Sequence, residues 1–156
     1  MISISPLKAG DIDNITRLFH RLWHATQASL QDPRMARHRD LGFFRTRVVE
    51  RADRTIVAKA DSELAGFATW TGGTLNSLFV ADMFQGRSIG AALCAAVETR
   101  MAEAGAPTFE LHCIEGNHRA RAFYEARGWR VDRLQSIDSE TPEGLCHVST
   151  WLMVKP

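Results

Sequence analysis

The sequence has 156 residues, of which 45% are hydrophobic and 24% charged, values typical of one globular domain with a continuous core. A formal net charge of +1 argues against a strongly basic nucleic-acid-binding protein, and we expect neither nucleic acid nor a membrane as a partner. No apolar run is long enough to cross a bilayer, and the first residues, MISISPLKAGD, lack the pattern of a secretory signal. A cytoplasmic location is therefore expected.

The first third of the chain is predicted to be mainly helical. A short strand over residues 2–5 precedes Asp11, which can cap a helix. Residues 26–39 are polar and contain Pro33, so a broken helix or a mobile loop is expected there, followed by a second amphipathic helix. The predicted buried faces of the two helices are Ile12, Ile15, Phe19 and Leu22, and Leu41, Phe44 and Val48.

Strands and helices alternate in the rest of the chain. Strands over residues 55–60, 64–70 and 74–81, with tight turns at DSE and at Gly72-Gly73, predict an antiparallel meander. The elements expected after it are a helix over 87–104 with a buried row (Ile89, Leu93, Val97 and Met101), a strand over 108–114, a helix over 117–127, and strands over 129–137 and 145–154 joined by the polar loop DSETPEG. Residues 74–114 then form a right-handed crossover between two parallel strands. The predicted fold class is α/β, a mixed sheet in one domain spanning residues 1–156.

Cysteine and histidine spacing predicts neither disulfides nor a metal site. Cys94, Cys113 and Cys146 are odd in number, far apart and set in apolar stretches, so they are expected to be buried reduced thiols. His20 and His24 are spaced as helical neighbours and could form half of a metal site, but no third ligand is indicated. Exposed or acceptor-pocket positions are the favoured interpretation for these two histidines.

The stretch QGRSIGAALC, residues 85–94, marks a change from strand to helix. The first amides of a helix have no acceptor within it and lie at the positive end of its dipole, so they can bind an anion. Gly86 and Gly90 would let a phosphate approach the backbone, and Arg87 adds a positive charge. A tight turn could also need these glycines for structural reasons alone. The Gly-Lys-Ser/Thr ending of a Walker loop is absent, and serine occupies the second glycine position of a dinucleotide-binding motif.

At this turn the chain resembles the GNAT superfamily of acetyl-CoA-dependent N-acetyltransferases. The family's pyrophosphate motif is Q/R-x-x-G-x-G/A after a strand, and Gln85, Ser88 and Gly90 occupy its three marked positions, with a departure at Ser88. The stretch GNHRARAFYEARGW, residues 116–129, is similar to a second family segment. Its matching positions are Asn117, Ala120, Phe123, Tyr124, Gly128 and Trp129. The resemblance covers residues 55–130 closely.

The resemblance implies a fold, a co-substrate and a binding site. It implies a mostly antiparallel sheet with a central pair of splayed parallel strands, flanked by helices, and acetyl-CoA as co-substrate without a metal. The amides of the turn would bind the CoA pyrophosphate, the preceding strand would pair with the pantetheine arm, and an asparagine would contact CoA or a water near the thioester. The residues carried over for cofactor binding are Leu78, Phe79, Val80, Gln85, Gly86, Arg87, Ser88, Ile89, Gly90, Ala91, Asn117 and Tyr124.

The resemblance also implies how the reaction is catalysed. Tyr124, the only tyrosine, holds the family position of the general acid, and a phenol is protonated at neutral pH. The alternative is a core tyrosine packed beside Phe123. His112 lies five residues before the motif asparagine, where some members carry a carboxylate base, and imidazole can accept a proton near neutral pH. Glu110 is a weaker candidate, and Thr74, at another family base position, has no basic group.

The expected function is transfer of an acetyl group to a primary amine of a small molecule or peptide, by direct attack in a ternary complex. The alternative is a non-catalytic acyl-CoA-binding regulatory module. Residues 26–53 mix basic and acidic side chains and do not indicate the acceptor. The resemblance places Trp23, Phe43 and Phe44 on helices that roof the acceptor site, and core is favoured for them over a substrate cage. His118, Arg119 and Arg121 form a basic cluster that meets CoA phosphates or only solvent. The C-terminal strands with Trp151 and Met153 could pair with a second copy in a homodimer.

Overall fold

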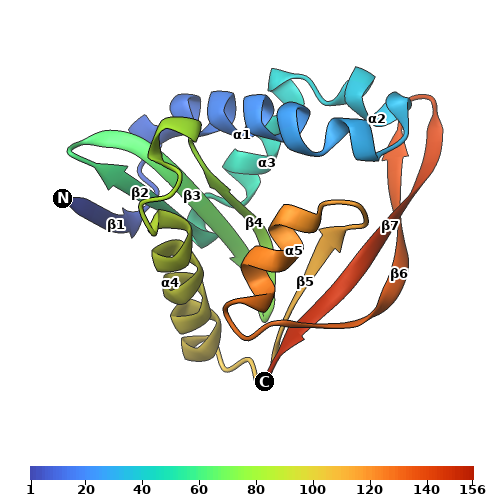
Figure 1. The fold of residues 1–156 in the computed structure, drawn as a ribbon. Helices are drawn as coiled ribbons and strands as arrows, with labels where there is room; N and C mark the ends of the chain where they lie inside the picture. Colours follow the sequence, from blue (N-terminus) through green and yellow to red (C-terminus); the bar gives the residue numbers. More distant parts are fainter.

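A computed structural model describes residues 1–156 and contains a seven-stranded sheet in the order β1-β2-β3-β4-β5-β7-β6 (Figure 1). The strands are β1 (Ile2–Pro6), β2 (Thr55–Ala60), β3 (Glu63–Thr71), β4 (Thr74–Val80), β5 (Phe109–Ile114), β6 (Arg130–Thr141) and β7 (Gly144–Lys155). The helices are α1 (Ile12–Thr26), α2 (Pro33–His38), α3 (Leu41–Glu50), α4 (Ile89–Glu103) and α5 (His118–Glu125). Only β4 and β5 are parallel, so the predicted mixed α/β fold is confirmed.

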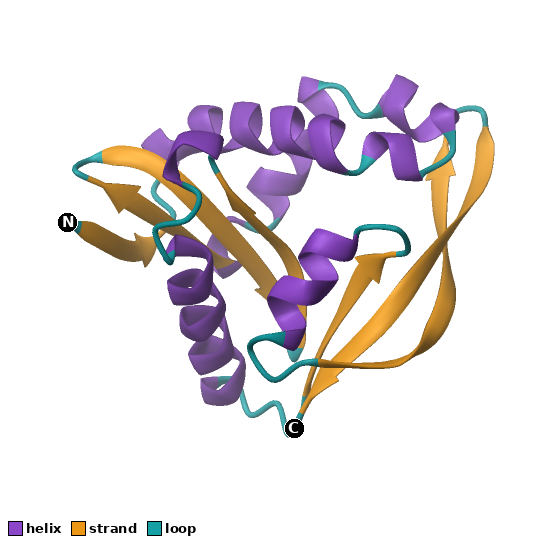
Figure 2. Cartoon of the chain, in the orientation of Figure 1, coloured by secondary structure: helices purple, strands orange, loops and turns teal.

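Helices cover both faces of the sheet (Figure 2). Phe19 of α1 and Phe44 of α3 have ring centroids 4.6 Å apart, and Phe19 lies 5.3 Å from Phe67 of β3. α4 covers the opposite face, where Leu93 Cδ1 would lie 3.2 Å from a Cβ atom placed on Gly66. Neighbouring residues of a strand point to opposite faces, so Gly66 and Phe67 mark the two sides of the sheet.

The parallel strands β4 and β5 pair only at one end and then separate. The pairing consists of Thr74 with Glu110 and Leu75 with Leu111. The register between β3 and β4 shifts at Asn76. Thr69 pairs with Ser77 and Trp70 pairs with Leu75, so Asn76 has no partner in β3. This β-bulge at Asn76 bends β4 away from β5. The expected splayed pair is confirmed, and the β5-facing backbone of β4 after Leu75 makes no ladder with β5.

Several local predictions are confirmed at helix ends and in the core. The side chain of Asn117 caps α5 by accepting a hydrogen bond from the Ala120 amide, 3.2 Å away. Gly105 and Gly128 follow α4 and α5 with φ of +87° and +90°, the left-handed conformation typical of helix ends. Residues 26–39 form a broken helix, with a 3₁₀ turn at Ala28–Leu30 before α2. The row Ile89, Leu93, Val97 and Met101 is fully buried.

Three local predictions are wrong. Asp11 does not cap α1: its carboxylate accepts a hydrogen bond from the Lys8 amide and pairs with Lys59, each at 3.0 Å. Leu41 is 48% exposed because it begins α3 and lies outside the packed face of that helix. Residues 138–141, predicted as loop, belong to β6 and pair with β7, so the connection is much shorter than DSETPEG.

The cysteines and the C-terminal strand lie inside the chain. Cys94, Cys113 and Cys146 are free and buried, as predicted. Trp151 is only 7% exposed and Met153 is fully buried, so neither side chain offers a surface to a second copy. No helix in the structure has the length and apolar character needed to cross a membrane.

Candidate active site

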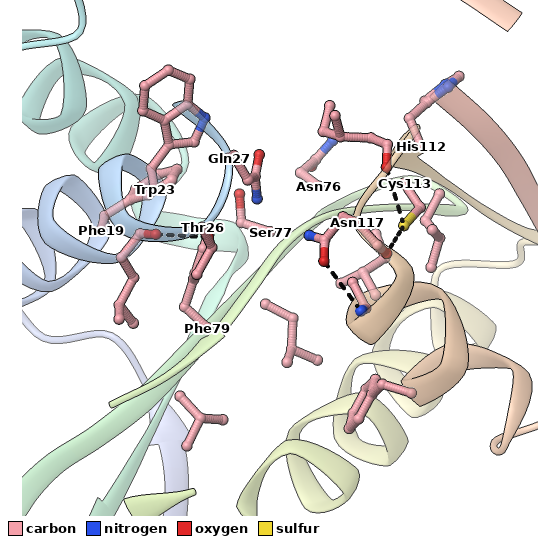
Figure 3. Close-up of a pocket in the computed structure, with 18 of the residues that line it drawn as sticks. Phe19, Trp23, Thr26, Gln27, Asn76, Ser77, Phe79, His112, Cys113 and Asn117 are labelled. Atoms are coloured by element: carbon pink, nitrogen blue, oxygen red, sulfur yellow. Dashed lines mark hydrogen bonds between the residues drawn. The ribbon is translucent and has the colours of Figure 1, made fainter. Parts of the chain in front are cut away.

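A cavity of about 790 Å³ lies where β4 and β5 separate, and it collects most of the predicted site residues. Figure 3 shows Phe19 and Trp23 of α1 on one side, Ser77 and Phe79 of β4 between, and His112 of β5 on the other side. Every predicted cofactor-binding residue except Arg87 lines the cavity: Leu78, Phe79, Val80, Gln85, Gly86, Ser88, Ile89, Gly90, Ala91, Asn117 and Tyr124. The two candidate catalytic residues, Tyr124 and His112, both line it.

The amides at the start of α4 are free to bind a ligand. The first hydrogen bond of the helix runs from the Ala92 amide to the Ser88 carbonyl, 3.0 Å away. The amides of Gly86 to Ala91 precede that bond and donate to no earlier carbonyl of the turn. Six consecutive donors at the positive end of a 15-residue helix form a site for an anion. The cavity and these donors fit the pyrophosphate and pantetheine of CoA.

The two glycines of the turn have different roles. Gly86 has φ of +78°, and a Cβ atom there would meet no other atom within 4 Å. A Cβ atom on Gly90 would lie 3.0 Å from Cε1 of Phe123, a contact that is too close for ordinary packing. Gly90 is therefore needed for the contact between α4 and α5, in addition to any effect on ligand approach. Ser88, where the family motif has glycine, has φ of +62°, also left-handed.

The side chains of Gln85 and Arg119 fix the turn. Gln85 Nε2 donates to the Val80 carbonyl at 3.2 Å, and Arg119 of α5 donates to Gln85 Oε1 at 2.7 Å. Arg119 is thus the member of the predicted basic cluster that reaches the site. Arg87 does not line the cavity, and its guanidinium lies 5.5 Å from the centroid of the Phe84 ring.

The other two members of the basic cluster belong to a separate contact. The His118 ring lies 5.5 Å from the Trp151 ring, and the Arg121 guanidinium lies 4.7 Å from it. Arg121 also pairs with Glu125 at 3.5 Å. These contacts cover Trp151 and do not contribute to the cavity.

Tyr124 is half-buried at the wall of the cavity. Its ring packs edge-on against Phe123, with centroids 5.1 Å apart, and against Trp129, with centroids 6.0 Å apart. Burial raises the pKa of the phenol well above its ordinary value, and the nearby Cys94 and Cys113 act in the same direction. The phenol therefore carries its proton throughout the neutral range and can donate it.

Hydrogen bonding fixes the tautomer of His112. Thr150 is fully buried, and its hydroxyl donates to the Gln135 carbonyl at 3.0 Å. The same hydroxyl lies 3.3 Å from His112 Nδ1 and has no second proton, so it accepts from Nδ1–H. In the neutral ring Nε2 then carries a lone pair, and it has no partner within the chain. Glu110, the weaker base candidate, does not line the cavity and accepts a hydrogen bond from Thr74 at 3.4 Å.

The opposite wall of the cavity contains residues that the sequence pattern did not single out. Arg39, Arg47 and Arg51 line it, as do Trp23 and Phe43, two residues for which core was favoured over a substrate cage. Phe43, Arg47 and Arg51 are spaced four residues apart on α3 and its end, a pattern visible in the sequence. What the sequence alone did not indicate was that this face of α3 borders a cavity.

The histidines of α1 do not join the site. His20 and His24 have ring centroids 4.5 Å apart, but neither lines the cavity. His24 Nε2 donates to the Arg39 carbonyl at 2.7 Å and so connects α1 to the segment before α3. Burial lowers the pKa of His20, and the neighbouring His24 lowers it further. No group of three or more potential metal ligands is present.

Comparison with known proteins places these features in a family. The sequence model of the acetyltransferase (GNAT) family matches residues 15–129. Among solved structures, the PaiA N-acetyltransferase of Thermoplasma acidophilum in complex with coenzyme A is 20% identical, with a TM-score of 0.70, covering 99% of this chain and 98% of that one. The GCN5-related N-acetyltransferase from Kribbella flavida is 22% identical, with a TM-score of 0.74, covering 99% of this chain and 97% of that one.

A third similar structure is yncA from Salmonella typhimurium, a putative acetyltransferase solved with its cofactor acetyl-CoA. It is 15% identical, with a TM-score of 0.69, covering 99% of this chain and 92% of that one. No curated protein sequence matches the chain. The family match spans β4, the turn at the start of α4 and the α5 segment, and it covers most of the chain. The chain therefore belongs to the acetyltransferase (GNAT) family, and it is an acetyl-CoA-dependent N-acetyltransferase.

Proposed function

We propose that the enzyme acetylates a primary amine of a small molecule or peptide by direct attack in a ternary complex. The observation that carries this proposal is the single cavity that joins the free amides at the start of α4, the unpaired edge of β4, Tyr124 and His112. Acetyl-CoA supplies an activated acyl group, and the chain has to orient it, exclude water and move protons.

We assign the binding of acetyl-CoA mainly to backbone groups. The amides of Gly86 to Ala91 would hold the pyrophosphate, and Gln85 keeps the turn in place through Val80. The backbone of Leu78, Phe79 and Val80 would pair with the pantetheine arm as an added strand. Asn117 can contribute its side-chain Nδ2, because its Oδ1 is already used to cap α5.

We assign the role of general acid to Tyr124. When the C–S bond of the thioester breaks, the sulfur must gain a proton to leave as a thiol. The buried phenol is protonated at neutral pH, which supports this role. The oxygen of Tyr124 has no hydrogen-bond partner within the chain, so no other group competes for its proton.

We assign the role of general base to His112. The attacking amine must lose a proton as the new C–N bond forms, and His112 Nε2 can accept it directly or through a water. Thr150 supports this by holding the proton on Nδ1. Thr150 is thus a positioning residue and not a catalytic one.

Direct transfer is favoured over an acyl-cysteine intermediate. Cys113 is the only cysteine that lines the cavity. Burial raises its pKa to about 11, so the thiol is not ionised near neutral pH and is a weak nucleophile. Cys94 is held in the same state, because burial raises its pKa to about 12.

The proposal is tested with acetyl-CoA and a panel of primary amines, by measuring thiol release and acetyl-CoA binding on the same samples. Tyr124→Phe should lower turnover at least tenfold with little change in CoA affinity. His112→Gln should remove the acidic limb of the pH–rate profile, and His147→Gln, an exposed histidine paired with Asp138, is the control. Unchanged turnover in Tyr124→Phe would refute its acid role. Binding of acetyl-CoA without thiol release from any amine would favour the acyl-CoA-binding module.

We also propose that the enzyme acts in the cytoplasm as a homodimer. The reduced, buried cysteines support a reducing compartment. Strand β6 is at the edge of the sheet and carries Leu134, which is 56% exposed. Because Trp151 and Met153 are buried, we assign the pairing to this edge instead. Sedimentation analysis of the wild type and of Leu134→Glu tests the dimer.

A further inference from the structure

Three arginines meet on the wall of the cavity opposite α5. Arg39 comes from the segment between α2 and α3, and Arg47 and Arg51 come from α3 and its end. All three side chains are half-buried, and none forms an ion pair with a carboxylate of the chain. Three other arginines of this region do pair: Arg34 with Asp32, Arg37 with Glu143, and Arg45 with Asp13.

Aromatic rings hold these arginines in place. The Arg39 guanidinium lies 4.8 Å from the Trp23 ring centroid and 4.6 Å from that of Phe43. The Arg47 guanidinium lies 5.0 Å from the same Phe43 ring centroid. Arg39 also donates to Ser139 Oγ at 3.3 Å. The ring contacts orient the cations but do not neutralise them.

In the free protein, no carboxylate forms an ion pair with these three cations. Burial and, after it, the charge of Arg47 lower the pKa of Arg39 to about 10. Burial, followed by the charge of Arg47, also lowers the pKa of Arg51. Like charges that are partly removed from water destabilise one another unless an anion meets them. Asp138 is the only carboxylate residue that lines the cavity, and it is paired with His147 at 2.7 Å.

The three arginines lie apart from the pyrophosphate turn. The Arg51 carbonyl accepts a hydrogen bond from the Thr55 hydroxyl at 2.7 Å. Thr55 pairs with Thr69 of β3, and Thr69 pairs with Ser77 of β4, so the end of α3 is level with the middle of β4. The turn begins only after β4 has ended at Val80, and α4 lies on the opposite face of the sheet from α3. The cations therefore lie away from the amides that would hold the CoA pyrophosphate.

We propose that the acceptor amine carries an anionic group, a carboxylate or a phosphate, which binds to Arg39, Arg47 and Arg51. This inference rests on the proposed N-acetyltransferase function and specifies its substrate class. The guanidinium groups match the geometry of both anions, and the Trp23 and Phe43 rings bound the pocket beside them. The same positive field disfavours the ammonium form of the acceptor nitrogen and repels polyamines.

Matched pairs of amines test the inference. The probes are amino acids with their carboxamides, phosphoethanolamine with ethanolamine, tetrapeptides with Glu or Gln at the second position, and spermidine. Thiol release should give a kcat/KM at least tenfold higher for the anionic member of at least one pair, and spermidine should be a poor substrate. The pairs distinguish a carboxylate from a phosphate. Equal or faster turnover of the neutral members or of spermidine would overturn the inference.

Variants link the preference to the arginines. Arg47→Gln and Arg51→Gln should each lower kcat/KM about tenfold for the anionic acceptor and less than twofold for its neutral partner. Arg47→Lys should retain part of the activity. Arg45→Gln is the matched control, because Arg45 is on the same helix but exposed and paired with Asp13. CoA affinity and the melting temperature, measured for every variant, should stay near wild type. An anionic preference that survives both glutamine substitutions would refute the assignment.

A binding measurement separates this inference from the proposed function. Trp23 lies against Arg39, so the same probes are titrated against the CoA-bound protein with tryptophan fluorescence as the readout. Saturable binding of anionic probes that is lost in Arg47→Gln, with no thiol release from any amine, would refute the transferase proposal and leave the anion site standing. Thiol release without any anionic preference would support the transferase proposal and refute the anion site. No binding and no turnover with the anionic probes would overturn the inference as well.

Discussion

Replacing Ser88 by glycine should stabilise the protein. Ser88 has φ of +62° and ψ of +16°, the left-handed helical region, and its side chain makes no capping hydrogen bond. A side chain in this conformation costs about 1 to 2 kcal/mol, because Cβ approaches the following carbonyl oxygen. Glycine removes that cost but adds freedom to the unfolded chain, worth about 0.4 to 1 kcal/mol. We therefore expect a net gain of about 1 kcal/mol, or about 3 °C in melting temperature for a domain of this size.

Two further serines provide matched controls for this measurement. Ser62, in the turn between β2 and β3, has φ of +72° and does not line the cavity, so Ser62→Gly should give a similar gain. Ser136 lies in strand β6 with no positive φ, and Ser136→Gly should lower stability by about 0.5 to 1 kcal/mol. The assays are thermal and urea unfolding, with CoA affinity measured by calorimetry.

Two results would refute this reasoning. If Ser88→Gly is destabilising, as expected for Ser136→Gly, residue 88 is not left-handed in the folded protein. If only Ser88→Gly changes CoA affinity more than about threefold, the serine also alters the free amides beside it. We expect CoA affinity to change less than that, because the amides already precede the first helical hydrogen bond.

The remaining predictions concern packing and charge. Glu98 of α4 accepts hydrogen bonds from Lys155 Nζ at 2.6 Å and from Trp129 Nε1 at 3.3 Å. Urea unfolding should show that Glu98→Ala lowers the free energy of unfolding by about 2 kcal/mol. The double variant with Lys155→Met should recover part of that loss. Gly90→Ala should cost about 1 to 3 kcal/mol by its contact with Phe123, and Phe123→Leu should reduce that cost in a double-mutant cycle. Hydrogen bonds from Arg37 and His38 lower the pKa of Glu143 to about 2, so its stabilising effect is present above its ordinary pKa and is lost as the pH falls toward 2. The difference in melting temperature between wild type and Glu143→Gln should therefore shrink over that acidic range, and a difference independent of pH would contradict the link between α2 and the β6–β7 turn.

Local patterns predicted the elements whose structure depends on near neighbours. The row Ile89, Leu93, Val97 and Met101 is buried because its four-residue spacing keeps all four side chains on one face of α4. Asn117 caps α5 because its short side chain reaches an amide three residues later. Both outcomes follow from the geometry of one helix, so the sequence was sufficient to predict them.

Predictions were wrong where a distant partner decides the structure. Residues 138–141 are polar and resemble a loop, yet they are a strand because β7 supplies the hydrogen-bond partners. Their side chains alternate between exposed and half-buried with the period of a strand, but all four are polar, so the sequence itself shows no such alternation. Asp11 was expected to cap α1, but Lys59 of β2, distant in sequence, provides a competing ion pair.

The two ends of the cavity are specified in different ways, and this explains why only one of them was predictable. The CoA end depends on backbone: the bulge at Asn76 opens β4, and the turn after Gln85 leaves amides free, features marked by glycines and by a short motif. The proposed acceptor end depends on side chains of α3, and the packing of Phe44 against α1 positions this helix. Because Arg47 and Arg51 contact neither the turn nor β4 through hydrogen bonds, changes there can alter acceptor choice while CoA binding is preserved. If the proposed anion site is correct, substitutions of these arginines measure acceptor choice separately from CoA binding.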